Sequence, residues 1–405
     1  MKKRLLLLFL VLPFLSIAQE NEKALKTRFT NFLSNSYYSL NFGGIFYPFS
    51  NANLLSGYEA ESLSRNWFSG RLLLGHKLNN SLSVQFGTMR PADWFQYENI
   101  NNINAPRSVW INAWSLSLKQ DLNLSKKTSI YGEAGIANLT RVGFTVFDDL
   151  VYPDAHYGSL LYGFGIQYRL SPKWRLSLNG TFLPESQKHN QPSISQATFG
   201  FEYHLQQVDQ DTATAYANND YFFPENILQF GYGTGALGFG VNRFFSMNIH
   251  VGDFQSFGIP IFWLGDVKAQ HALSLTYQRL IYRSEKIFSL DWGASVTYFN
   301  SEGGSDVWAF SVFPVLRFYL KRTPGYDFYA NYSIIGPTWI SEKDIDGHDT
   351  GPNATFQDFM GFGAFFGKDR KYNIELRIMH YSNGNNFTDN GGVAIPIQFT
   401  FGRTF

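Results

Sequence analysis

Hydrophobic and polar residues alternate along most of the chain in short runs, the pattern of β-strands whose two faces meet different surroundings. In the first half such runs fall near residues 37–49, 66–77, 82–97, 109–121, 128–143, 157–170, 174–184 and 195–206. The run 288–298 alternates most clearly, with Phe288, Leu290 and Trp292 on one face and Ser289, Asp291 and Gly293 on the other. Counting back from Phe405 gives about eight strands in the second half, although 227–268 does not divide clearly into one strand or two.

The connections between these runs alternate in length. Short turns fall at residues 78–80, 125–127 and 171–173, and longer connections fall between them at 50–65, 98–108, 144–156 and 185–194. Outer-membrane barrels have short turns on the periplasmic side and longer loops outside the cell. The pattern therefore predicts an all-β chain that forms a transmembrane, antiparallel β-barrel of the outer-membrane type.

A polar stretch without alternation, residues 207–225, separates the two halves. As a single periplasmic turn it would be far longer than its neighbours, so we expect two tandem eight-stranded barrels, with one barrel of about sixteen strands as the alternative. The expected units are an N-terminal barrel at 19–206, a linker at 207–225 and a C-terminal barrel at 226–405. Because side chains fill an eight-stranded barrel, solute conduction is not expected.

The N-terminus has the order of a secretory signal. Three cations at Lys2, Lys3 and Arg4 precede an apolar run and then Ser16-Ile17-Ala18, so residues 1–18 are predicted to be a signal peptide. The apolar run is too short to cross a bilayer as a helix, and later apolar stretches are broken by polar residues or glycine. These features predict that the protein is located in the outer membrane of a Gram-negative bacterium, with any active site toward the outer leaflet.

Composition narrows the function. Aromatic residues make up 18% of the chain and charged residues only 16%, which suits a barrel with an aromatic, lipid-facing exterior. The net charge of +1 and the lack of a basic stripe argue against nucleic-acid binding, and zero cysteines exclude disulfides and thiolate metal sites. The acidic segment around Asp344, Asp346, His348 and Asp349 lacks the glycine and terminal glutamate of a calcium loop, so no metal or other cofactor is expected.

Candidate chemistry lies near the C-terminus, in His380-Tyr381-Ser382-Asn383. Residues two apart on a strand share a face, so His380 and Ser382 lie on the same side as the apolar residues that precede them, Ile374, Leu376 and Ile378. If that face meets lipid, a base and a nucleophile meet lipid near one membrane rim. A neighbouring imidazole can activate a serine hydroxyl, which suggests an esterase whose substrate is a lipid.

The spacing His380-x-Ser382-Asn383, then Asn390-Gly391-Gly392 and a last strand ending in an aromatic, resembles the lipid A 3-O-deacylase (PagL-like) family. The likeness covers the second half, most firmly 356–405, and includes Asp358-Phe359-Met360-Gly361 in the preceding strand. It implies an eight-stranded barrel with the active site on its lipid-facing surface. By position, His380 matches the family's general base and Ser382 its nucleophile, while Asn383 and Asn390 match asparagines that support the site or bind the oxyanion. The implied partners are lipid A, or lipopolysaccharide, and outer-membrane lipids.

One position departs from the family. The family's third residue, a glutamate, falls on Ala394, so the carboxylate that would orient the imidazole is not matched. Three readings follow: Asp389 or another loop acid substitutes, the site works as a dyad, or the barrel is inactive. The leading hypothesis is an outer-membrane serine esterase that removes an ester-linked acyl chain from lipid A or a related outer-leaflet lipid. The alternative is a non-catalytic barrel with a structural or binding role.

Overall fold

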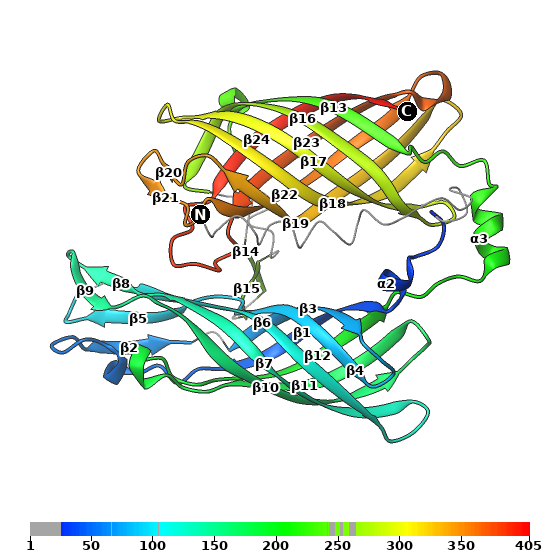
Figure 1. Cartoon of the computed structure of the whole chain (residues 1–405). Helices are drawn as coiled ribbons and strands as arrows, with labels where there is room; N and C mark the ends of the chain where they lie inside the picture. Colours follow the sequence, from blue (N-terminus) through cyan, green and yellow to red (C-terminus); the bar gives the residue numbers. More distant parts are fainter. Residues whose placement is uncertain are drawn as a thin grey trace, which may run out of the picture.

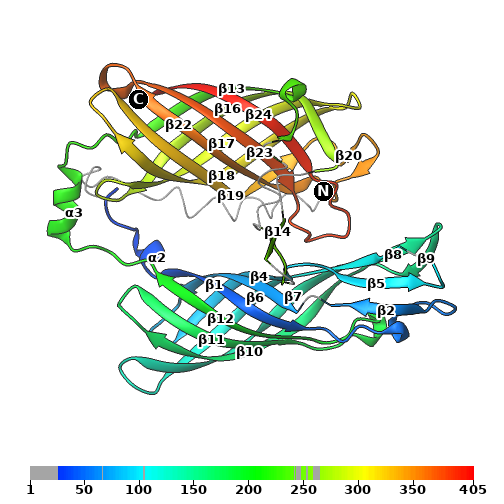
Figure 2. The same cartoon turned by 180° about the vertical axis from the view of Figure 1, so that it is seen from behind.

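The computed structural model describes residues 26–65, 67–103, 105–240, 242, 248–251, 254–258 and 265–405. The predicted signal peptide at 1–18 lies outside these residues. Within them the chain forms two closed β-barrels that lie side by side, with helix α3 between them in sequence (Figure 1). Both views place the long-loop ends of the barrels on the same side of the molecule and α3 at the opposite side (Figures 1 and 2). The two barrels are therefore oriented so that one membrane can hold both.

The N-terminal barrel closes when β6 pairs with β7 and β1 pairs with β12, all antiparallel. Its strands are β1 (Ser36–Phe46), β3 (Phe68–Lys77), β4 (Leu82–Pro91), β6 (Arg107–Asn123), β7 (Thr128–Val142), β10 (Ala155–Arg169), β11 (Trp174–Leu183) and β12 (Ile194–His204). The long connections carry four short strands, β2 (Ala60–Ser64), β5 (Phe95–Ile100), β8 (Phe144–Val146) and β9 (Asp149–Tyr152). Seven of the eight runs predicted from the alternation match barrel strands, whereas the run 82–97 comprises β4 and the start of β5.

The C-terminal barrel closes when β13 pairs antiparallel with β24. Its strands are β13 (Asn226–Thr234), β16 (Val267–Arg283), β17 (Phe288–Ser301), β18 (Asp306–Arg322), β19 (Tyr326–Ile340), β22 (Ala354–Phe366), β23 (Tyr372–Ser382) and β24 (Val393–Thr404). Outside the barrel lie two small hairpins, β14 (Asn248–Val251) with β15 (Phe254–Gly258), and β20 (Asp344–Ile345) with β21 (His348–Asp349). The prediction of two tandem eight-stranded barrels is confirmed, and the sixteen-stranded alternative is wrong because each half closes on itself.

The polar stretch between the barrels contains α3 (Gln210–Ala217), which the sequence pattern did not reveal. The Asp209 carboxylate caps this helix by accepting from the Thr212 amide at 2.8 Å. Only Ala213 is buried, so the helix lacks the apolar stripe from which it could have been predicted. The other short helical segments are α2 (Asn31–Ser34), η3 (Asn51–Asn53), η4 (Gln187–His189), η5 (Gly235–Leu237) and η6 (Lys368–Arg370). No helix of the described residues is long and apolar enough to span a membrane.

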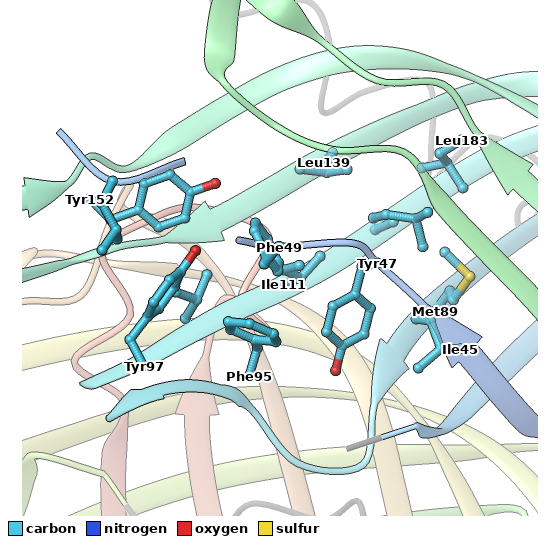
Figure 3. Packing of buried hydrophobic residues seen from close by; sticks show 14 of the residues in the cluster. Ile45, Tyr47, Phe49, Met89, Phe95, Tyr97, Ile111, Leu139, Tyr152 and Leu183 are labelled. Atoms are coloured by element: carbon cyan, nitrogen blue, oxygen red, sulfur yellow. The ribbon is translucent and has the colours of Figure 1, made fainter. Parts of the chain in front are cut away.

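Polar side chains line much of the barrel lumens, together with buried apolar clusters, while apolar side chains cover the outside. In the N-terminal barrel Arg71 forms a two-pronged contact with Glu133, at 2.6 and 2.9 Å, so the buried charges are paired. Near its long-loop end, an aromatic cluster that includes Phe49, Phe95 and Tyr97 fills the interior instead (Figure 3). In the C-terminal barrel the buried Arg317 guanidinium contacts the Asp291 carboxylate. Both lumens hold packed side chains.

Candidate active site

The candidate site lies on the outer face of three adjacent strands, β22, β23 and β24. Antiparallel register places Asp358 of β22 directly opposite His380 of β23, and Ala394 of β24 directly opposite the same histidine. One step closer to the loops, Phe356 of β22 is opposite Ser382. Because directly paired residues point to the same face of a sheet, all five side chains project outward. The sequence-predicted base and nucleophile therefore share a face, as expected.

A carboxylate contacts the histidine from the strand before it. His380 Nδ1 lies 3.2 Å from Asp358 Oδ1. The His380 side chain is 3% exposed and that of Asp358 20% exposed, so the contact is partly shielded from solvent. With Nδ1 facing the carboxylate, Nε2 is the nitrogen that can accept a proton from a nucleophile.

The contact of Asp358 with His380 was not predicted from the sequence. Its strand had been included in the family resemblance, but no role was given to its acid. One signal was available: Asp358 is the only acid on the outward face that it shares with Phe356, Met360 and Phe362. Asp358 lies opposite His380 only because of the register in which β22 and β23 pair, and the alternation pattern alone does not give that register.

Ala394 points outward because of a β-bulge in β24. Arg377 is paired with Gln398, and two residues later Met379 is paired with Ile395, so β24 uses one residue more than β23 over this step. Counting alternation back from Phe405 would have placed Ala394 inside the barrel. The bulge resets the register, and the position where the family has its glutamate flanks His380 on the side away from Asp358.

Ser382 is half-buried at the end of β23, two residues beyond His380. Among the described residues no hydrogen bond joins the Ser382 hydroxyl to the His380 imidazole. In a free enzyme, catalytic hydrogen bonds are often long and tighten only when substrate binds. Along the same face Ile374 and Leu376 are 49% and 42% exposed, whereas His380 is covered. The outward face thus changes from open to covered as β23 approaches the loop.

The two asparagines organise the loop that follows β23. Asn383 Nδ2 donates to Asp389 O at 2.6 Å and to Thr350 O at 3.1 Å. The Asn383 amide donates to Asn390 Oδ1 at 2.9 Å, and Asn390 Nδ2 donates to Asn385 Oδ1 at 2.6 Å. These donors hold the loop together, which favours site support over direct binding of an oxyanion in this conformation.

Asp389 occupies the rim of the loop. Its side chain is exposed, and its carboxylate accepts from the Thr388 hydroxyl at 3.5 Å, while its backbone carbonyl receives Asn383. The carboxylate that contacts His380 comes from Asp358 and not from Asp389. As a substitute acid, Asp389 stays a prediction that this geometry does not favour.

The acidic loop around Asp344 is held by hydrogen bonds within the loop and to the loop at 301–305. Asp346 accepts from the Ser301 and Ser305 hydroxyls at 2.6 and 2.9 Å, which links this loop to the neighbouring one. Hydrogen bonds from the Lys343 ammonium and the Gly351 amide hold the pKa of Asp349 below its ordinary value. Within the described part of the chain, no three His, Asp or Glu side chains are grouped so that they could hold a metal ion.

These features define an outer-membrane-type protein of two barrels, the second of which carries an outward Asp-His contact beside a serine. The family model for lipid A 3-O-deacylase (PagL) matches residues 263–395. The resemblance of the C-terminal half to this family is confirmed. No curated protein matches the chain.

Solved structures of single outer-membrane barrels are similar to part of the chain. The outer membrane enzyme PagL is 16% identical, with a TM-score of 0.31, and the match covers 44% of this chain and 99% of that one. Neisserial surface protein A is 12% identical, with a TM-score of 0.28 and coverage of 42% and 97%. The N-terminal barrel domain of Pseudomonas aeruginosa OprF is 13% identical, with a TM-score of 0.28 and coverage of 42% and 96%.

Proposed function

We propose that the chain is an outer-membrane serine esterase that removes an ester-linked acyl chain from lipid A or a related outer-leaflet lipid. The observation that carries this proposal is the contact between His380 and Asp358 on the outer face of a barrel, with Ser382 next on the same face. The match of residues 263–395 to the lipid A 3-O-deacylase family supports the reaction class. A site on the outer surface suits a substrate that never leaves the bilayer.

The chemistry follows from the order of the three side chains. His380 Nε2 takes the proton of the Ser382 hydroxyl as the serine oxygen bonds to the ester carbonyl carbon. The tetrahedral intermediate collapses, the ester C–O bond breaks, and His380 returns the proton to the departing sugar-linked oxygen. Water then repeats the sequence on the acyl-serine and releases a fatty acid. Asp358 holds the imidazole and stabilises its charge while it carries the proton.

The proposal requires the site to face the outer leaflet. The loop 383–392 and the acidic loop are joined, since the Gly391 amide donates to Asp349 O at 3.0 Å, and both lie at the end opposite α3 (Figure 1). If the short turns face the periplasm, as in other outer-membrane barrels, Ser382 lies near the level of the outer-leaflet ester bonds.

A non-catalytic barrel is the second candidate, and the burial of His380, only 3% exposed, favours it. Mass spectra of lipid A from cells that express the wild type, the Ser382→Ala variant or neither protein separate the two. The esterase reading expects a lipid A species lighter by one acyl chain only with the wild type. Identical spectra in all three, with folded protein in the membrane, would leave the non-catalytic barrel.

A further inference from the structure

The loop that follows β23 contacts the N-terminal barrel as well as its own. Asn112 Nδ2 of β6 donates to the carbonyls of Gly384 and Asn385, at 2.9 and 3.2 Å. On β7, Asn138 Nδ2 donates to Asn386 Oδ1 at 2.7 Å. Side chains of one barrel thereby bind the backbone and a side chain of the loop that carries Asn383 and Asn390.

Two more contacts extend this surface, which we call the β6–β7 dock and define by Asn112, Trp114, Asn138 and Thr140. The Thr140 hydroxyl donates to Asn386 O at 3.1 Å. Trp114 Nε1 lies 3.4 Å from Gly384 O, so the indole N–H reaches the same carbonyl as Asn112. All four dock residues donate to the loop.

The dock side chains point out of their own barrel. On β6, Ser115 and Ser117 are buried in the lumen, whereas Leu116 and Leu118 are 51% and 50% exposed on the outer wall. Asn112 lies on that same outer face yet is only 4% exposed. Polar groups on a lipid-facing wall are costly unless they are paired. Here the loop of the other barrel accepts from the Asn112 amide N–H, and the Asn112 amide oxygen accepts from the Thr88 hydroxyl at 3.1 Å.

The shape of the loop matches the dock. Gly384 and Asn385 both have positive φ, +65° and +55°, in the left-handed region, so the chain turns sharply as it leaves the active-site strand. A β-carbon at residue 384 would lie 3.2 Å from Trp114 Cζ2, which is a tight contact. The turn therefore needs a small residue where the loop meets the indole.

The dock also reaches the sheet that carries the nucleophile. The Trp114 ring stacks on Phe356, with centroids 6.0 Å apart and planes at 23°. Phe356 is the direct cross-strand partner of Ser382. The N-terminal barrel thus contacts Phe356, the cross-strand partner of the proposed nucleophile. It also contacts Gly384, which directly follows Asn383 in the chain.

We infer that the outer wall of β6 and β7 positions the active-site loop, so that the N-terminal barrel is a working part of the esterase in the C-terminal barrel. This inference rests on the proposed function. The dock residues are positioning residues, because they touch the loop and Phe356 rather than the reacting atoms. Asn138 and Asn112 fix the loop that Asn383 and Asn390 organise, and Trp114 fixes the side chain beside Ser382.

Steady-state kinetics on the full-length protein in detergent test the role. Asn138→Leu should lower kcat about tenfold and leave KM within about twofold. A misplaced loop reduces stabilisation of the transition state more than it reduces binding of the substrate. Asn138→Gln keeps an amide donor and should restore much of the loss. Leu116→Ala, on the exposed part of the same wall, is the matched control and should behave as wild type. Folded Asn138→Leu protein with wild-type kcat would overturn the inference.

A cross-linking experiment tests the dock without relying on catalysis. The chain has no cysteine, so Asn138→Cys with Asn386→Cys introduces a single thiol pair. A short bifunctional thiol reagent should join the halves, and they should stay joined after cleavage at a protease site inserted in 207–225. The pair Ile136→Cys with Asn386→Cys, two residues along β7, should join poorly. Equal yields for both pairs would contradict the dock, whether or not the wild type hydrolyses lipid. Efficient cross-linking of the first pair in a protein that hydrolyses no lipid would refute only the catalytic role.

Discussion

Asp358 and His380 are direct cross-strand partners, and their side chains meet at 3.2 Å on the outer face of the C-terminal barrel. If this carboxylate orients the imidazole, Asp358→Asn should lower kcat by roughly 10²–10⁴-fold with little change in KM. Asp389→Asn is the comparison and should change kcat little, because its carboxylate lies at the loop rim. Ester hydrolysis by purified protein measures both. A large loss of kcat in Asp389→Asn, with none in Asp358→Asn, would mean that Asp389 is the acid that orients His380.

The bulge in β24 allows a test by rescue. Ala394 flanks His380 from the other side, so the double variant Asp358→Asn with Ala394→Glu moves the carboxylate across the histidine. We expect the double variant to recover at least part of the activity lost in Asp358→Asn. Heat-modifiable gel mobility reports whether the barrel tolerates a larger side chain at the buried Ala394. A folded double variant no more active than the single one would argue that this flank cannot serve the imidazole.

Ser382 and His380 should behave as one unit. Ser382→Ala, His380→Ala and the double variant should each abolish deacylation to a similar extent, because removing either partner disables the same step. The measurement is release of fatty acid from lipid A and from a simple acyl ester. Additive losses would mean that the two residues act separately and that the assigned roles are incorrect.

The lumen of the C-terminal barrel should be sensitive to a broken ion pair. Arg317 and Asp291 are both buried, and Arg317 also donates to Gln278. Arg317→Leu leaves the aspartate charge without its partner and should lower the free energy of unfolding by about 3–5 kcal/mol. Arg317→Leu with Asp291→Leu should cost less than the single change. Urea unfolding followed by gel mobility gives the values, and equal losses for single and double variants would contradict this reasoning.

Membrane orientation can be read by labelling, since the native chain offers no thiol. Cysteine at the exposed Glu342, in the acidic loop, should react with an impermeant maleimide on intact cells. Cysteine at the exposed Asp369, in the short turn before β23, should react only after the outer membrane is opened. The reverse pattern would place Ser382 near the inner leaflet and remove lipid A from the list of substrates.

Strand positions followed from the sequence because alternation is a local property, and an apolar exterior with a polar lumen enforces it along every strand. The shared face of His380 and Ser382 was likewise predictable, since residues two apart on a strand point to the same side. Asp358 was not, because its proximity to His380 depends on the pairing between strands. The outward position of Ala394 was also beyond prediction, since the bulge that creates it depends on how β24 meets β23.

The contacts between the barrels were also out of reach of the sequence pattern. Asn112 and Asn138 lie on largely apolar outward faces, but nothing local indicates that their partners lie in a loop more than two hundred residues away. The same holds for α3, whose single buried side chain gives no periodic signal. Each of these features depends on contacts between residues far apart in the sequence.

The linker that contains α3 lowers the affinity that the dock needs, because it keeps the two barrels together. The linker is tied to the segment before α2 and to the C-terminal barrel: the Thr27 hydroxyl donates to Ala213 O at 2.8 Å, and Arg283 of β16 donates to Tyr216 O at 2.5 Å. A short tether keeps two surfaces at an effective local concentration on the order of millimolar, so contacts too weak to join separate molecules remain formed. A handful of hydrogen bonds at the rim therefore suffices within one chain, and the same surfaces on two untethered barrels would spend most of their time apart.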